Sequence, residues 1–361
     1  MVLRFQLLSV CCLWSLGVFC QDTAKEKPKI TVGGYVDAYV GYHSVEPTDK
    51  AVPFFVSSAR HNEFNINLAY VTVSYEAERI RGRLTPAIGT YMAANYAAEP
   101  PNFRHFQEAS AGVRLWAKRN IWLDVGLIGS PFTNETCISK DHLLYSRSLA
   151  PEYVPYYLTG AKLTLPLSSK LNLYLYLLNG WQNIVETNDN KALATQLEYR
   201  PTAKTLFNWN TYIGNEQSIV TPENRMRYFT DLYTTYNTDG KLSVTACIYA
   251  GVQQRQTNQT QTDHLWGQAN VAMRYRLSVV AAVAGRVEYY YDPDKVQIQT
   301  NSLLKGFNGG SFSLGYTHKI TENALFRVEN RTFFTQDDSL VLNNGFAKHA
   351  NWSVANLTLW F

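Results

Sequence analysis

The side chains with the greatest chemical potential in this sequence are charged residues that recur at every second position. Arg327, Glu329 and Arg331 follow one another in this way, and so do Arg286 and Glu288. Alternate residues of a β-strand project from the same face of a sheet, so each group predicts a row of charges on one face. Such rows either orient polar solutes by their electric field or pair with charges on neighbouring strands and stiffen the sheet, and both interpretations stay open.

Patterns typical of catalysis and metal binding are missing from the sequence. The seven histidines fall mostly where we expect loops or strand ends, and the sequence contains neither an HExxH nor a GxSxG motif. Beyond the N-terminal segment, only Cys137 and Cys247 remain as cysteines, and their spacing does not suggest a metal site. We therefore expect no enzyme activity, no cofactor, no metal and two unpaired thiols. A hydrolase assembled from side chains of neighbouring strands is a weaker alternative.

The N-terminus has the pattern of a secretory signal. Arg4 precedes an apolar stretch at 7–19, which is too short to cross a bilayer as a helix. Cleavage after Cys20 would leave a polar segment; a lipid-modified Cys20 is the alternative, although Phe19 directly before it fits that alternative poorly. The sequence thus predicts a signal peptide at 1–20 and a short periplasmic segment at 21–29. No later stretch is long and apolar enough for a membrane-spanning helix.

The composition combines few charges with many aromatic rings. The 361 residues include 33 basic and 29 acidic side chains, beside 24 tyrosines, 17 phenylalanines and 8 tryptophans. This balance is typical of a wall with one apolar and one polar face. The basic residues are scattered singly, which argues against binding to nucleic acid.

After residue 30, the chain repeats segments in which every second side chain is apolar. In one of them Ile80, Leu84 and Ile88 fall on one face, whereas Arg81 and Arg83 fall on the other. A helix would mix these two sets, so the pattern predicts strands. The expected strands are 31–42, 63–77, 79–91, 106–118, 120–129, 156–166, 170–180, 192–200, 204–214, 225–236, 240–252, 264–276, 278–290, 309–319, 324–335 and 350–361.

Short and long connections alternate between these segments. This alternation predicts that 30–361 is an all-β domain, a transmembrane antiparallel up-and-down β-barrel of about 16 strands, give or take two. Its apolar face would meet lipid, and its polar face a wet lumen. The segment 63–77 is the weakest, because its apolar phase changes between Leu68 and Val71 and so implies a bulge or a wrong assignment.

Aromatic residues gather near the ends of several expected strands. We expect Tyr289-Tyr290-Tyr291, Tyr156-Tyr157 and Trp360-Phe361 to lie at the membrane interfaces. The final segment 356–361 alternates and ends in phenylalanine, which resembles the C-terminal signal by which bacterial outer-membrane barrels are recognised for assembly.

Several short motifs, in their order, resemble one family. They are Gly33-Gly-Tyr-Val-Asp-Ala-Tyr39, Gly126-Leu-Ile-Gly-Ser-Pro-Phe132, Tyr145-Ser-Arg-Ser148, Pro155-Tyr-Tyr157 and Asn179-Gly-Trp181. With them the chain resembles the OmpL-like outer-membrane β-barrel porin family, called putative β-barrel porin-2, over essentially all of the mature sequence. The resemblance implies a pore in the outer membrane of a Gram-negative bacterium, without naming its solute.

A barrel of about sixteen strands is wide enough to hold a water-filled channel. We therefore expect a porin for passive diffusion of small polar solutes. The alternative is a non-conducting outer-membrane barrel that acts as a surface receptor or binding partner through its long loops. The expected partners are outer-membrane lipid and small polar solutes, with no nucleic acid. A homotrimer is suggested only by analogy with other large porins, and the sequence leaves it open.

The alternation also predicts which charges face the lumen. The expected pore-lining residues are Arg81, Arg83, Arg114, Arg274, Arg276, Arg286, Glu288, Arg327, Glu329 and Arg331, and Asp37 and Asp124 are expected to point inward as well. The surplus of arginine suggests a weak preference for anions. The longest connection, 130–155, is the candidate constriction loop, and an exposed surface loop is the alternative. Its charged residues are Glu135, Lys140, Asp141, Arg147 and Glu152.

Overall fold

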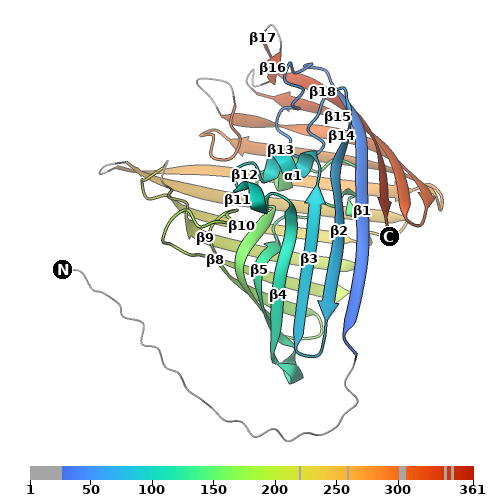
Figure 1. Cartoon of the computed structure of the whole chain (residues 1–361). Coiled ribbons are helices and arrows are strands. Elements are labelled where there is room, and N and C mark those ends of the chain that lie inside the picture. The colour runs from blue at the N-terminus through green and yellow to red at the C-terminus, as the bar shows by residue number, and fades with distance from the viewer. Residues whose placement is uncertain (1–26, 219–220, 258–259, 301–305, 337–339, 343–344) are drawn as a thin grey trace, which may run out of the picture.

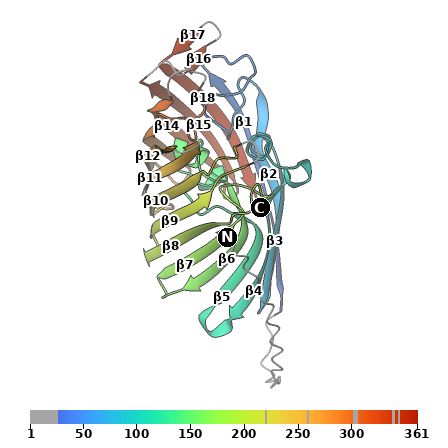
Figure 2. The ribbon, with the colours of Figure 1, turned by 90° about the vertical axis from the view of Figure 1, so that its left-hand side faces the viewer.

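The computed structural model describes residues 27–218, 221–257, 260–300, 306–336, 340–342 and 345–361. Over these residues sixteen antiparallel strands close into one barrel, in which each strand pairs with its neighbours along the ring and β1 pairs with β18. Figures 1 and 2 show this ring of strongly tilted strands from two sides. The predicted barrel and its number of strands are therefore confirmed.

The elements agree closely with the expected segments. The strands of the ring are β1 (Lys29–His43), β2 (Phe64–Glu76), β3 (Ile80–Ile88), β4 (Phe106–Trp116), β5 (Ile121–Gly129), β6 (Tyr157–Pro166), β7 (Leu171–Leu178), β8 (Ala192–Thr202), β9 (Thr205–Asn215), β10 (Met226–Tyr236), β11 (Leu242–Thr257), β12 (Thr260–Arg276), β13 (Ala281–Asp292), β14 (Phe307–Thr321), β15 (Ala324–Thr335) and β18 (His349–Trp360). Two further strands, β16 (Leu340–Leu342) and β17 (Gly345–Ala347), form a separate hairpin.

The described helices all lie in connections between strands. They are α1 (Thr90–Asn95) and α2 (Leu149–Glu152), with the 3-10 turns η1 (Pro101–Phe103), η2 (Ala117–Arg119) and η3 (Ser139–Asp141). None of the helices in the described part of the chain has the length and apolar character needed to cross a membrane.

The connections alternate in length as expected. Short turns follow the even-numbered strands from β2 to β14, and long loops follow most of the odd-numbered strands. The predicted boundary at residue 30 is one residue late, because β1 already begins at Lys29. The predicted signal peptide at 1–20 lies outside the described residues.

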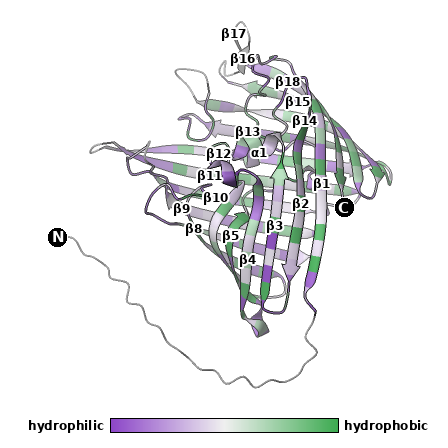
Figure 3. Ribbon diagram, viewed as in Figure 1, coloured by the Kyte–Doolittle hydropathy of each residue, from purple (hydrophilic) through white to green (hydrophobic). Residues whose placement is uncertain are grey.

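The wall has one apolar and one polar face. In β3, Ile80, Leu84 and Ile88 are 53%, 46% and 58% exposed, whereas Thr85 between them is buried. Figure 3 shows the resulting alternation of hydrophobic and hydrophilic residues along the strands. Exposed large apolar side chains recur on the outer face of nearly every strand, which is the surface that a bilayer covers.

The change of phase in the second strand is a β-bulge. Asp37 of β1 pairs with Leu68, while the next residue, Ala38, pairs with Ile66. Asn67 is thus the extra residue, and its amide donates to the Asp37 carboxylate at 3.0 Å. As a consequence Leu68 points inward and is fully buried, although its place in the alternation predicted an outward direction.

The sequence led us to expect a polar interior throughout, but part of the interior is apolar. Near the end of the barrel that carries the long loops, inward aromatic rings from many strands pack into one apolar core with side chains of the 130–155 loop. The rings of Phe132, Trp181 and Phe229 lie within 5.7 Å of one another by their centroids. Strand alternation cannot distinguish an inward tyrosine that meets water from one that a loop covers.

This packing also corrects the prediction for two of the aromatic residues that we expected at the membrane interfaces. Tyr289 and Tyr291 point outward and are 41% and 40% exposed, but Tyr290 between them is buried in the core. Tyr157 is covered by the ring of Tyr96, which stacks on it with centroids 4.4 Å apart.

Candidate functional site: the barrel interior and the 130–155 loop

The segment 130–155 lies inside the ring, and most of its hydrogen bonds to the wall go to strands on one side of it. Its Thr133 amide donates to the Asp231 carboxylate of β10 at 2.6 Å. Its Asn134 side chain donates to Thr245 of β11 and Asn270 of β12, at 2.9 and 3.1 Å. The loop therefore crosses the lumen and does not project from the surface.

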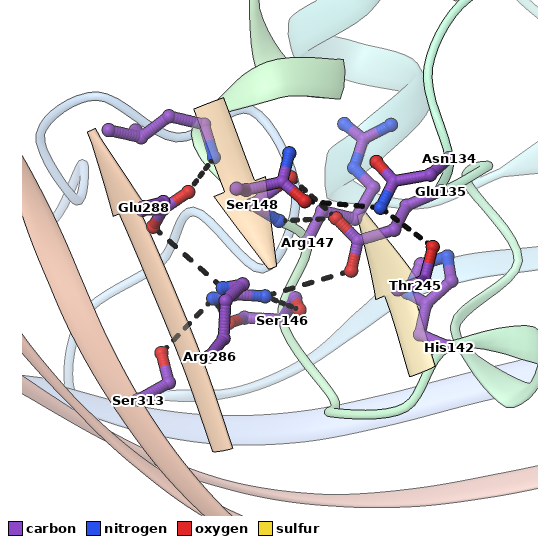
Figure 4. A network of polar contacts seen from close by, with 12 residues as sticks. Asn134, Glu135, His142, Ser146, Arg147, Ser148, Thr245, Arg286, Glu288 and Ser313 are labelled. Atoms are coloured by element: carbon purple, nitrogen blue, oxygen red, sulfur yellow. Dashed lines mark hydrogen bonds and ion pairs between the residues drawn. The ribbon is translucent and has the colours of Figure 1, made fainter. Parts of the chain in front are cut away.

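A buried network around Arg286 of β13 fixes the middle of this loop (Figure 4). The guanidinium donates to the carbonyl and hydroxyl oxygens of Ser146, at 2.6 and 2.9 Å. Glu329 of β15 accepts from the same serine, from its amide at 2.7 Å and its hydroxyl at 2.6 Å. Arg286 also lies 3.5 Å from Glu329 and 3.7 Å from Glu135 of the loop, so a wall cation is shared between wall and loop carboxylates.

A second set of contacts holds the next residues of the loop. Arg331 of β15 donates to the Arg147 carbonyl oxygen at 2.8 Å and forms an ion pair with Glu288 of β13. Glu288 also accepts from the Leu149 amide at 2.5 Å. Because each of these charged groups is buried and hydrogen-bonded, the network satisfies charges that would otherwise be costly to remove from water.

A third set lies where the loop approaches β1 and β18. Arg327 of β15 donates to the carbonyl oxygen of Ser139 at 2.6 Å and to its hydroxyl at 2.7 Å. That hydroxyl donates to Asp37 of β1 at 3.1 Å, and the Asn356 amide of β18 donates to the same carboxylate at 3.0 Å. The short side chain of Ser139 thus allows the loop backbone to approach the wall closely.

The burial of these groups corrects part of the pore-lining prediction. Five of the ten predicted residues face inward as expected but lie beneath the loop with exposures of at most 3%, and so do not meet open solvent; they are Arg286, Glu288, Arg327, Glu329 and Arg331. The pattern of alternation fixed their direction, and the loop that covers them was not visible in their own strands.

The opposite side of the interior carries charges that stay partly exposed. Asp124 of β5 accepts from Arg81 of β3 at 2.5 and 2.6 Å and lies 3.8 Å from Lys162 of β6. Arg83 of β3 pairs with Glu108 of β4 at 2.9 Å, and its side chain is 46% exposed. These ion pairs form a ladder across neighbouring strands whose outer ends remain in contact with solvent.

The ladder continues on both sides. Arg200 of β8 pairs with Glu198 at 3.1 Å and is 53% exposed. Arg114 of β4 lies over the ring of Trp122, with its guanidinium carbon 4.8 Å from the ring centroid. Arg274, another predicted pore residue, donates to the backbone of Thr238 in the turn between β10 and β11.

The sequence-based prediction of pore-lining residues missed four members of this ladder, namely Glu108, Lys162, Glu198 and Arg200. The register places Glu108, Lys162 and Glu198 on the same face as Arg81 and Asp124, and Arg200 joins them through its ion pair with Glu198. The same alternation that selected the arginines would have found them, had it been applied to every charged residue of each strand.

The predicted loop residues divide into two groups. Glu135, Arg147 and Glu152 are buried, and Arg147 pairs with Glu152 at 2.9 Å. Lys140 and Asp141 pair with each other and keep 27% and 54% of their side chains exposed. Among its charged residues the loop therefore presents only the Lys140–Asp141 pair of its η3 turn to solvent, while its other charges bind the loop to itself and to the barrel.

A cavity of about 340 Å³ separates the loop from the β3–β8 side of the wall. Arg83, Gln107, Gln196 and Tyr233 line it from the wall, and Thr133 and Arg147 line it from the loop. This cavity is the place where solvent-facing charges of the ladder and the buried part of the loop come together.

Burial shifts the ionisation of the titratable loop groups. It lowers the pKa of His142 to about 3, assisted by the positive charges of Arg147 and Arg327, and it raises the pKa of the Cys137 thiol. His142 is therefore neutral at physiological pH. Cys137 and Cys247 are both free. No group of three or more metal-ligating side chains occurs among the described residues.

A closed ring of sixteen tilted strands, apolar outside and charged inside, with one long loop folded into the lumen, defines a membrane channel of the porin class. The family model described as "Putative beta-barrel porin-2, OmpL-like" matches residues 29–361, and the chain belongs to this family. The predicted family is thereby confirmed. A comparison with curated protein sequences finds no match.

Several solved structures of outer-membrane proteins have a similar fold. The chain is similar to in-vitro folded OmpT of Vibrio cholerae, with a TM-score of 0.60, 8% identity and coverage of 94% of this chain and 100% of that one. The chain is also similar to an anion-selective porin of Comamonas acidovorans, with a TM-score of 0.59, 10% identity and coverage of 93% of this chain and 100% of that one. For the outer-membrane channel DcaP of Acinetobacter baumannii the TM-score is 0.63 and the identity 9%, with coverage of 92% of this chain and 97% of that one. OmpT is also described in a trimer form.

At these identities the structures show the fold alone. The family and the fold together make this chain an outer-membrane porin of Gram-negative type, a channel and not an enzyme.

Proposed function

We propose that the barrel conducts small polar solutes with a weak preference for anions, along the β3–β8 side of the lumen. The observation that carries this proposal is the charge of that side. Within the bounds of β3 to β8 five cations stand against three carboxylates: Arg81, Arg83, Arg114, Lys162 and Arg200, against Glu108, Asp124 and Glu198. A surplus of positive charge along a narrow aqueous path favours anions.

The other side of the lumen does not oppose this preference. The arginines of β13 and β15 are buried under the loop. Arg286 and Arg331 are paired with Glu135, Glu288 and Glu329, and Arg327 donates to Ser139 and Asn356, so these arginines are not open to a passing ion. Solutes therefore meet the exposed ladder on one side and the η3 turn of the loop on the other.

Reversal potentials in planar bilayers test the proposal. With potassium chloride at different concentrations on the two sides, an anion preference shifts the reversal potential from zero toward the equilibrium potential of chloride. The Lys162→Glu variant replaces one partly exposed cation by a carboxylate and is expected to abolish the preference. A wild-type channel that selects potassium over chloride would contradict the proposal.

The non-conducting alternative is favoured by one observation, the apolar core that fills much of the lumen near the long loops. If this core closes the channel completely, the chain acts as a binding partner through its loops. Discrete steps of current from the purified, folded protein support conduction, whereas a folded barrel that never opens supports the alternative.

We also propose that the barrel forms a homotrimer through the outer face of β15 and β18. On this face Asn330 and Ser353 form a hydrogen bond of 2.8 Å, and Thr332 and Asn351 form one of 2.7 Å. Amide groups directed at hydrocarbon are unfavourable, so a protein surface is the better neighbour for them. They border a groove of about 740 Å³ on the outer side of β1, β13, β14, β15 and β18, which a second copy would fill.

Native mass spectrometry of the detergent-solubilised protein tests this assembly. The double variant Asn330→Leu with Ser353→Leu removes the first of these two polar pairs and is expected to weaken or dissociate the trimer. Thr211→Leu, on the outer face of β9, is the matched control and should leave it intact. A wild-type protein that is monomeric in several mild detergents would contradict the proposal.

A further inference from the structure

The cavity between the 130–155 loop and the β3–β8 wall contains polar atoms that no described residue satisfies. The Nη2 group of Arg147 and the hydroxyl of Thr133 are buried without a hydrogen-bond partner, and so is the side-chain oxygen of Gln107. Leaving a buried donor or acceptor unpaired is unfavourable. The three atoms form a set of two donors, one of them charged, and one acceptor.

Arg147 is held so that only one edge of its guanidinium is available. Its Nε donates to Glu152 at 2.9 Å, and the rings of Tyr91 and Tyr156 lie 5.3 and 4.8 Å from its central carbon. Glu152 is fixed in turn, since it accepts from the Val56 amide at 2.8 Å. A guanidinium fixed in this way is suited to bind a planar anion.

Thr133, which lines the same cavity, is held in a strained conformation. Its φ of 66° lies in the left-handed region, which a β-branched residue rarely adopts. The hydrogen bond from its amide to Asp231, 2.6 Å long, keeps it there. Strained residues of this kind cluster at active sites, ligand clamps and switch regions.

The size and the walls of the cavity restrict the ligand further. A volume of about 340 Å³ is at the lower end of the range for small-molecule sites. The lining includes the rings of Tyr91, Phe132, Tyr156 and Tyr233, which favour a flat or apolar body.

From these observations we propose that the cavity is a binding site for a small organic carboxylate that also carries a hydrogen-bond donor. The carboxylate accepts from Arg147 and Thr133, and the donor of the ligand reaches Gln107. This site deepens the proposed function, on which it rests, because a solute that enters the channel would bind here before it passes the loop.

Isothermal titration of the full, folded chain in detergent with 4-hydroxybenzoate tests the site. Binding is expected for this probe and not for the uncharged 4-hydroxybenzamide. Thr133→Val keeps the β-branched shape and the hydrogen bond from the backbone amide to Asp231. It removes only the hydroxyl, and should weaken binding about 3- to 10-fold. Arg147→Gln should weaken it about 10-fold or more, and Thr133→Val keeps the test valid if loss of the Glu152 partner disturbs the loop.

A matched variant separates the site from the proposed selectivity. Lys162→Gln changes the exposed ladder, outside the cavity lining, and should reduce the anion preference while leaving the affinity for 4-hydroxybenzoate unchanged. Thr133→Val should do the reverse. The site proposal is overturned if the wild-type channel conducts chloride but binds neither probe, or binds both equally. Binding without any conductance would instead overturn the proposed function and leave the site standing.

Discussion

Two regions of the barrel interior use the same residue types in opposite ways. On β13 and β15 the arginines are covered by the 130–155 loop, and the side chain of Arg286 has no exposed surface. On β3 and β8 the arginines are open, and the side chain of Arg200 is 53% exposed. An inward arginine therefore indicates a polar interior, but only the loop decides whether the residue fixes structure or meets a solute.

The energetic consequences of the two environments differ. A buried ion that loses its partner remains in a medium that solvates it poorly, whereas an exposed ion that loses its partner is solvated by water. The covered region should therefore determine the stability of the loop, and the open region should determine the selectivity of the channel. The predictions below test this division, starting from the largest effect.

Removing the central cation of the covered region should have the largest effect on stability. Arg286→Met leaves Glu135, Glu288 and Glu329 buried with one counterion fewer, and we expect a loss of about 3–5 kcal/mol in the free energy of unfolding. Urea unfolding of the refolded barrel, followed by tryptophan fluorescence, measures this loss.

The matched change in the open region is Arg200→Met. It breaks an exposed pair with Glu198, which typically contributes about 0–1 kcal/mol. Equal losses for the two variants would show that the two regions do not differ as described.

Acid should weaken the covered region specifically. Because burial lowers the pKa of His142 to about 3 from 6.5, the unfolded chain binds a proton below pH 6.5 that the folded loop excludes. The stability contributed by neutral His142 is thus complete above about pH 6.5 and decreases as the pH falls toward 3. Between pH 7.5 and pH 5 we expect a loss of about 2 kcal/mol.

The comparison for this prediction is His142→Gln. Its side-chain amide can still donate to the Thr136 carbonyl oxygen, as the imidazole does at 2.9 Å, but does not titrate. The variant should lose less stability than the wild type over the same pH range. The same pH dependence in both proteins would assign the effect to other groups.

In the open region the expected effects are on selectivity. Asp124→Asn removes a carboxylate that lies between Arg81 and Lys162, so the surplus of positive charge increases by one. We expect the ratio of chloride to potassium permeability to rise roughly two- to threefold, measured from reversal potentials. A shift toward potassium would show that this ladder does not face the conducting path.

Alternation within single strands was sufficient to predict the ring but not the filling of its interior. The exposed Ile80 and Leu84 confirm the outward face. The change of phase in the second strand predicted either a bulge or a wrong assignment, and the structure has the bulge. The direction of Arg331 followed from the same rule. That Ser146 and Arg147 lie against it follows from contacts between residues more than 180 positions apart, which no local pattern contains.

The apolar core was missed for a related reason. Tyr249 and Tyr290 alternate with outward residues as lumen-facing side chains do, and only the packing of the 130–155 loop makes them a core. A long loop rich in apolar residues, such as Phe132, Leu144 and Leu149, is the one signal in the sequence that could have indicated it.

The central claim, that solutes pass along the β3–β8 side and not along the covered side, is tested most directly by modifying single cysteines during current recording. In a Cys137→Ala, Cys247→Ala background, Lys162→Cys places a thiol on the open ladder, and Ser313→Cys places one beneath the loop, where Ser313 is fully buried. A bulky charged thiol reagent should reduce the current through the Lys162→Cys channel and leave the Ser313→Cys channel unchanged. Block at Ser313→Cys without block at Lys162→Cys would place the conducting path on the other side of the barrel.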